Sequence, residues 1–142
     1  MEKITVKEVE YLSFRLARET MAFNEPIPDF ATRYPNILES CLATPFQTFG
    51  GKSLYLTFLS KASMLFYLMI KNHPFQNGNK RIAMTTLFLF LHKENKWLKV
   101  DAQELYNFTI WVASSPPELK DETIKAVEKF LRSHVIGLKG GT

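Results

Sequence analysis

Residues 53–94 read SLYLTFLSKASMLFYLMIKNHPFQNGNKRIAMTTLFLFLHKE, and this stretch decides the fold. Over residues 53–71, apolar side chains cover almost the whole circumference of a helix. The polar stripe consists only of Ser53, Thr57, Ser60 and Lys61. A second apolar run covers residues 80–94. Because a helix that is apolar on nearly all sides belongs inside a protein, the stretch predicts two buried central helices joined by a short polar segment.

Shorter helices are expected before and after the central pair. Thr5 and Glu8 form a capping-box pattern, which predicts a helix from there through Glu19. Asp101 and Glu104 form a second such start, for a helix that ends near residue 113. Amphipathic patterns predict two further helices, and their ranges are residues 37–42 and 121–134.

Proline and glycine mark the connections between these helices. Residues 24–35 contain three prolines and are expected to form a loop. Residues 45–51, PFQTFGG, are typical of a loop or small hairpin. We therefore expect an all-α, single-domain helical bundle over residues 1–136, with a small β-hairpin-like flap before the first central helix. Residues 137–142 should form a flexible C-terminal tail.

Composition restricts the class of protein. A chain of 142 residues that is 46% hydrophobic and 23% charged suits one globular domain. Cys41 is the single cysteine, which excludes an intramolecular disulfide and fits a buried side chain in a reducing cytoplasm. No apolar run approaches the roughly 20 residues that cross a bilayer, so no membrane partner is expected. The net charge of +4 is scattered, which argues against direct nucleic-acid binding.

The polar segment at residues 72–81 carries the residues suited to chemistry. Gly78 permits a left-handed backbone just before a helix, so the first amides of that helix, near Asn79, Lys80 and Arg81, lack intrahelical partners. Such a helix start attracts phosphate. His73 lies across the segment and is suited to remove a proton from a hydroxyl near neutral pH. Phe75 would anchor the segment in the core; a plain connection between helices is the alternative interpretation.

This segment, His73-Pro-Phe-Gln-Asn-Gly-Asn-Lys-Arg81, resembles the Fic signature His-x-Phe-x-Asp/Glu-Gly-Asn-x-Arg, with Asn77 at the acidic position. The stretch from Leu38 to Lys61 is similar to the segment that precedes the motif in death-on-curing toxins, and the resemblance covers nearly the whole chain. Lys80 stands where AMP-transferring members have Gly, as in the death-on-curing branch. Met84 stands where many of those members carry Arg.

The resemblance implies a role for each motif residue. His73 would be the catalytic base, while Gly78, Asn79, Lys80 and Arg81 would hold the phosphates of ATP or another nucleoside triphosphate. Thr48 and Phe49 would belong to the flap that docks the target by strand addition. The family's acidic residue binds Mg²⁺, and Asn77 at that position would hold the ion more weakly because it lacks the charge.

The resemblance therefore implies a cytoplasmic toxin kinase that phosphorylates a Ser or Thr hydroxyl of a target protein such as elongation factor Tu. Protein AMPylation on the same scaffold is one alternative. A Fic-fold binding module impaired by Asn77 is another. No inhibitory-helix pattern Ser/Thr-x-x-x-Glu-Gly/Asn occurs, so inhibition is expected from a separate antitoxin chain. An acidic antitoxin segment would suit the positive net charge.

Overall fold

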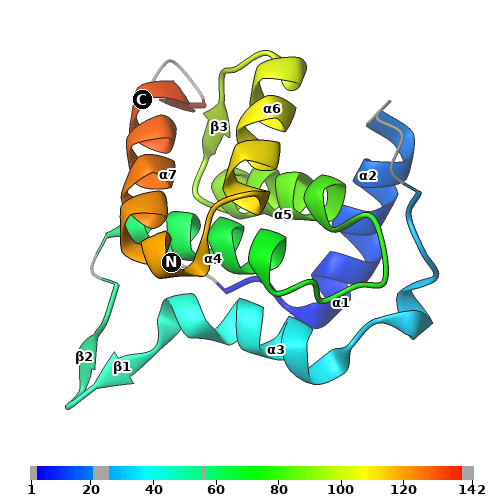
Figure 1. The fold of residues 1–142 in the computed structure, drawn as a ribbon, viewed down its shortest axis with the longest axis horizontal. Coiled ribbons are helices and arrows are strands. Elements are labelled where there is room, and N and C mark those ends of the chain that lie inside the picture. The colour runs from blue at the N-terminus through cyan, green and yellow to red at the C-terminus, as the bar shows by residue number, and fades with distance from the viewer. Residues whose placement is uncertain (1–2, 21–25, 56, 139–142) are drawn as a thin grey trace.

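The computed structural model describes residues 3–20, 26–55 and 57–138, and it confirms the all-α prediction (Figure 1). The helices are α1 Val6–Glu8, α2 Phe14–Thr20, α3 Pro35–Ala43, α4 Phe58–Lys71, α5 Asn79–Lys93, α6 Ala102–Ala113 and α7 Lys120–His134. The strands are β1 Thr48–Phe49, β2 Lys52–Ser53, β3 Lys96–Leu98 and β4 Val135–Gly137.

The pair α4 and α5 forms the centre of the molecule, as the apolar runs predict. Both helices are buried along most of their length and pack directly on each other. Helices α3, α6, α7 and α2 surround this pair (Figure 1). Their inward side chains join one continuous hydrophobic core, to which Cys41 also belongs, as expected.

Helix α4 begins later than the apolar run suggests, at Phe58 rather than residue 53. Thr57 caps it: the Ser60 amide donates to Thr57 Oγ1 at 3.0 Å, and the Thr57 amide donates to Ser60 Oγ at 3.0 Å. Because a reciprocal capping box satisfies the free amides at a helix start, it sets the boundary more strongly than the apolar residues before it.

Lys61, expected on the polar stripe, is buried, and its ammonium donates to Ser53 Oγ at 2.7 Å. Residue 56 lies outside the described residues.

The N-terminal helix starts with the predicted capping box. The Glu8 amide donates to Thr5 Oγ1 at 3.1 Å, and the Thr5 amide donates to Glu8 Oε1 at 2.9 Å. The helical run then passes through a π-helical turn at Val9–Ser13 before α2, which the periodicity did not predict. Asp101 caps α6 as predicted, by accepting from the amides of residues 103 and 104.

The connections carry short turns of 3₁₀ helix at Phe30–Thr32, Thr44–Phe46 and Pro117–Leu119. The loop expected over residues 24–35 begins within residues 21–25, which lie outside the described part, and its last proline is already the first residue of α3. In the described residues, no helix is long and apolar enough to cross a membrane.

The expected flap is a two-stranded hairpin. Strands β1 and β2 pair antiparallel with Thr48 opposite Ser53 and Phe49 opposite Lys52. The turn consists of Gly50 and Gly51, both with positive φ, 59° and 79°. Two-residue hairpin turns with positive φ at both positions match the twist of the strands, which is why glycine occupies them.

A second strand pair, β3 with β4, was not predicted. Trp97 lies opposite Ile136, and Lys96 lies opposite Gly137. The Leu138 amide donates to Asn95 O at 2.8 Å. The expected tail therefore starts too early at residue 137, because Gly137 is part of a strand; residues 139–142 lie outside the described part of the chain.

Candidate active site

The loop between α4 and α5 holds His73 in an unusual backbone conformation. His73 has φ of +50°, in the left-handed region that favours glycine, and a proline follows it. Such a conformation costs on the order of 1–3 kcal/mol and persists only where the surroundings fix it. One such contact is close by, since the Tyr34 amide donates to Pro74 O at 2.9 Å. The His73 side chain is exposed and therefore accessible to a substrate.

Asn79 holds the loop closed from inside. Its Oδ1 accepts from the Phe75 amide at 3.0 Å, and its Nδ2 donates to Phe75 O at 2.9 Å. Asn79 Nδ2 also lies 3.5 Å from His73 Nδ1. Since Asn79 is only 8% exposed, its side chain positions the loop and the imidazole from the protein interior.

Phe75 ties the same loop to the N-terminal part of the chain. Its side chain is 2% exposed. Its ring centroid lies 4.9 Å from that of Phe14 and 6.2 Å from that of Phe30. Aromatic contacts at these distances add to the burial of apolar surface. Phe75 is therefore placed as a loop anchor requires.

Gly78, at the N-cap of α5, approaches another segment too closely for a side chain. Its φ is +71°, and an added Cβ would lie 2.8 Å from Pro26 O and 3.0 Å from Ile27 Cδ1. Only glycine satisfies both the left-handed backbone and the close contact. The side chain of Asn77, the residue before Gly78, contacts the Gly78 backbone: Asn77 Oδ1 accepts a hydrogen bond from the Gly78 amide at 2.8 Å.

A cavity of about 380 Å³ opens beside this loop. The motif residues that line it are His73, Gln76, Asn77, Gly78, Asn79 and Lys80, and the remaining lining residues are Ile70, Tyr106 and Ala113. The cavity thus brings together His73 and the first turn of α5, a fifteen-residue helix. The positive end of the helix dipole at that turn favours an anion. A histidine and an anion-binding helix start therefore face one cavity.

Arg81 lies elsewhere. It is 7% exposed and is not among the residues that line the cavity. Its guanidinium donates to Ala17 O. Ala17 is within the last four residues of α2, where carbonyls lack intrahelical partners and a cation is favoured. Arg81 therefore ties α5 to the end of α2, and its expected role in phosphate binding stays a prediction.

Thr48 and Phe49 are also distant from His73. Their hairpin precedes α4 at its N-terminal end, while the motif loop follows α4 at its C-terminal end (Figure 1). Fourteen helical residues separate the two by about 21 Å. Phe49 is 80% exposed at the projecting hairpin. The structure does not bring the hairpin to the cavity, so its docking role stays a prediction.

The sequence reasoning missed the far wall of the cavity. Tyr106 and Ala113 come from α6, which is placed by tertiary contacts that no local pattern encodes. Lys71, at the end of α4, makes one of these contacts: its Nζ donates to Ala113 O at 3.2 Å and to Ser115 O at 2.5 Å. The sequence signal for this contact was a basic residue at a helix end, but that signal does not reveal which carbonyl groups the side chain reaches.

The cavity lining does not suit an Mg²⁺ ion held by the protein. Within residues 3–20, 26–55 and 57–138, no group of three or more His, Cys, Asp or Glu side chains is placed to bind a metal. The cavity lining includes no carboxylate, and Asn77 Oδ1 already accepts a hydrogen bond from Gly78. Because Mg²⁺ prefers charged oxygen ligands, these residues do not fit it.

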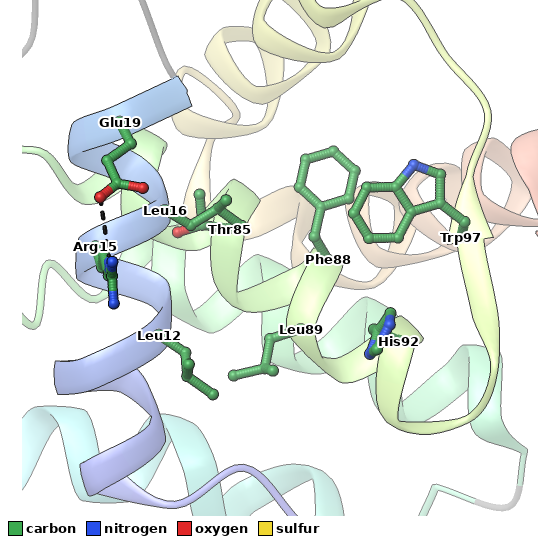
Figure 2. A pocket seen from close by; sticks show the side chains of 9 residues that line it. All are labelled: Leu12, Arg15, Leu16, Glu19, Thr85, Phe88, Leu89, His92 and Trp97. Carbon is green, nitrogen blue, oxygen red and sulfur yellow. Dashed lines mark hydrogen bonds and ion pairs between the residues drawn. The ribbon is translucent and has the colours of Figure 1, made fainter.

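A second hollow, of about 420 Å³, has a different character (Figure 2). It lies between α2 with its preceding turn on one side and α5 with β3 on the other. Phe88 stacks on Trp97 with ring centroids 4.8 Å apart, and the ion pair of Arg15 and Glu19 lies on the opposite side (Figure 2). No motif residue lines this apolar groove, so the cavity beside His73 is the candidate active site.

Comparison with known proteins identifies the family of the chain. A family model described as the Fic/DOC family matches residues 3–91, which include α4, the motif loop and all but the end of α5. No curated protein and no solved structure matches the chain. The match covers more than half of the 142 residues. The chain therefore belongs to the Fic/Doc family, whose members usually transfer phosphate or AMP to proteins.

Proposed function

We propose that this protein transfers the terminal phosphate of a nucleoside triphosphate to a hydroxyl of a target protein, as a kinase of the death-on-curing branch. The observation that carries the proposal is the shared cavity, in which exposed His73 faces the first turn of α5. A base and an anion-binding helix start are the two parts that phosphoryl transfer needs most, because it depends on positioning and on charge stabilisation.

Different residues of the chain bind the phosphates and remove the proton in this reaction. The amides at the start of α5 and the Lys80 side chain hold the phosphates. The target hydroxyl attacks the terminal phosphorus, the bond to the bridging oxygen breaks, and the nucleoside diphosphate leaves. A ring nitrogen of His73 takes the hydroxyl proton, and Asn79 keeps the imidazole in place.

Lys80 supports phosphate transfer over AMP transfer. Its side chain lines the cavity, so it adds a positive charge and fills space beside the helix start. Met84, at the position of the additional arginine of many AMPylators, is fully buried. AMPylation on the same scaffold remains the second candidate function, and Gly78 and Asn79 would serve both reactions.

A binding module without activity is the third candidate, and Asn77 favours it. Its amide oxygen accepts from the Gly78 backbone, and its side chain carries no charge for a cation. His73 favours an enzyme instead, because its side chain is exposed and its backbone is held in a strained conformation.

The remaining proposals concern the protein's partners and its location in the cell. A target such as elongation factor Tu, inhibition by a separate antitoxin chain and a cytoplasmic location follow from the resemblance to death-on-curing toxins. The net charge of +4 suits an acidic antitoxin segment. No nucleic-acid partner is proposed, because the basic residues are scattered along the chain.

One labelling experiment separates the candidate functions. The purified protein is incubated with Mg²⁺, a bacterial lysate and ATP that carries a radiolabel on either the γ- or the α-phosphate. Labelling of a protein band from γ-labelled ATP alone supports the kinase. Labelling from α-labelled ATP establishes AMPylation and contradicts the role given to Lys80. If neither nucleotide labels a band, the transferase proposal fails and the binding module is favoured.

A further inference from the structure

The hairpin of β1 and β2 is too short to hold its own orientation. Two residue pairs join its strands. A further backbone bond closes its base, since the Leu54 amide donates to Gln47 O at 3.0 Å. A two-stranded hairpin by itself is only marginally stable in water. Residues 47–52 are exposed, and the hairpin projects from the helices (Figure 1). Its orientation must therefore be fixed at its base.

Lys61 fixes this base from both sides. It is the fourth residue of α4 and is 7% exposed. Its ammonium donates to Ser53 Oγ in β2 at 2.7 Å and to Tyr55 O just after that strand. The same ammonium lies 5.7 Å from the ring centroid of Phe46, two residues before β1. One buried side chain thus contacts the chain where it enters the hairpin and where it leaves it.

The stability of the fold alone does not account for a lysine at this place. A cation near the N-terminal end of a helix is disfavoured by the helix dipole, and burying its charge carries a desolvation cost. An apolar side chain of similar length would pack against Phe46 without either cost. It would not supply the donors to Ser53 Oγ and Tyr55 O. The ammonium is therefore suited to holding the hairpin rather than to stabilising α4.

We infer that Lys61 is a positioning residue for the target protein, because it holds the hairpin in the orientation that a target segment recognises. In the described part of the chain, β1 and β2 pair only with each other, so their outer edges are available to a further strand. The role rests on the proposed transfer to a protein, with the target docked at the hairpin. The motif cavity lies about 21 Å away along α4, so nucleotide binding should not depend on Lys61.

Hydrogen exchange followed by NMR measures the orientation of the hairpin without any target. In Lys61→Met, the Leu54 amide should exchange roughly 10- to 100-fold faster than in the wild type, the range for loss of one hydrogen bond from a charged group. The amides within α5 should exchange as in the wild type. Lys71→Met is the matched control, because Lys71 lies at the other end of α4 and its ammonium also donates to backbone oxygens. Unchanged exchange of Leu54 in Lys61→Met, or equal acceleration in Lys71→Met, would overturn the role.

A labelling assay then separates positioning from folding. The initial rate at which γ-labelled ATP labels a protein band is measured over a dilution series of bacterial lysate. If the target binds only the correctly oriented fraction of hairpins, its apparent affinity falls by that fraction. Lys61→Met should therefore need roughly 10-fold more lysate for half the maximal rate, with the maximal rate and the dependence on ATP unchanged. A purely structural role would lower the maximal rate and leave both half-saturation points unchanged.

The outcomes keep this role distinct from the proposed function. If the wild type labels no band, the proposed transfer fails, and target docking fails with it. If the wild type labels a band and Lys61→Met depends on the lysate in the same way, only the role of Lys61 fails. Should Lys61→Met not fold, Ser53→Ala removes an acceptor of the same ammonium from the half-buried hairpin side. It is expected to speed Leu54 exchange and to raise the lysate requirement, and wild-type behaviour in both would overturn the role.

Discussion

Replacing Arg81 by glutamine should destabilise the protein even when no nucleotide is present. Arg81 is 7% exposed, and its guanidinium donates to Ala17 O near the end of α2. A hydrogen bond from a charged group contributes about 1.5–3 kcal/mol, and a cation at a helix C-terminus adds about 0.3–1 kcal/mol. Removing a buried charge also relieves its desolvation, which offsets part of the loss. We therefore expect the free energy of unfolding to fall by about 2 kcal/mol.

Urea unfolding followed by tryptophan fluorescence measures this change. A loss of about 2 kcal/mol corresponds to a midpoint lower by roughly 1 M urea for a protein of this size. Arg132→Gln is the control, because Arg132 is mostly exposed and pairs with Glu128 one helical turn away. That solvent-screened pair contributes only about 0.3–0.5 kcal/mol. If Arg81→Gln unfolds at the same urea concentration as Arg132→Gln, Arg81 does not hold α2, and the reasoning is refuted.

Three further predictions concern glycine, pH and thiol chemistry. Gly78→Ala should lower the melting temperature more than Gly51→Ala, because both glycines have positive φ but only Gly78 contacts another segment; equal losses in a thermal scan would count against this. Burial alone would raise the pKa of Glu8, but hydrogen bonds, of which the one from Lys93 is the largest, hold this pKa below its ordinary value. Glu8 therefore stabilises the fold above about pH 4.5, and this stabilisation disappears as the pH falls through the lowered pKa. In urea titrations from pH 7 to pH 2, the free energies of unfolding of the wild type and of Glu8→Gln should therefore converge in acid. A difference that stays constant over this pH range would contradict the prediction. Burial raises the pKa of Cys41 to about 12, so a thiol reagent at pH 8 should react only as fast as the protein unfolds, and rapid labelling of folded protein would show this to be wrong.

The central helices were predictable because their signal is local. Two long apolar runs interrupted by Pro74 and Gly78 leave few alternatives to a buried helix pair with a loop between. The start of α4 was misplaced because the apolar residues before Thr57 extend the pattern past the cap. The β3–β4 pair was not predictable in this way, since it joins residues about forty positions apart through backbone groups that every residue has.

The candidate site was predictable only in part, and helix geometry explains the limit. Consecutive helical residues point about 100° apart, so the motif alone does not tell which of its helical side chains line the cavity. The structure places Lys80 in the cavity and Arg81 under α2. The motif shows that a helix start is present but not which of its side chains turns inward. Tyr106 could not be found from the motif, because its place depends on how α6 packs against α4 and α5.

The most direct test of the proposed catalytic role compares His73→Ala with His92→Ala in the phosphate-transfer assay. His92 lies at the apolar groove beside Trp97, away from the motif cavity, so it is a matched control (Figure 2). His73→Ala should lose transfer by at least 10²-fold, as expected for removal of a general base, while its circular dichroism spectrum and its binding of ATP stay unchanged. His92→Ala should transfer as the wild type does. Undiminished transfer by folded His73→Ala would contradict the assignment of His73 as the catalytic base.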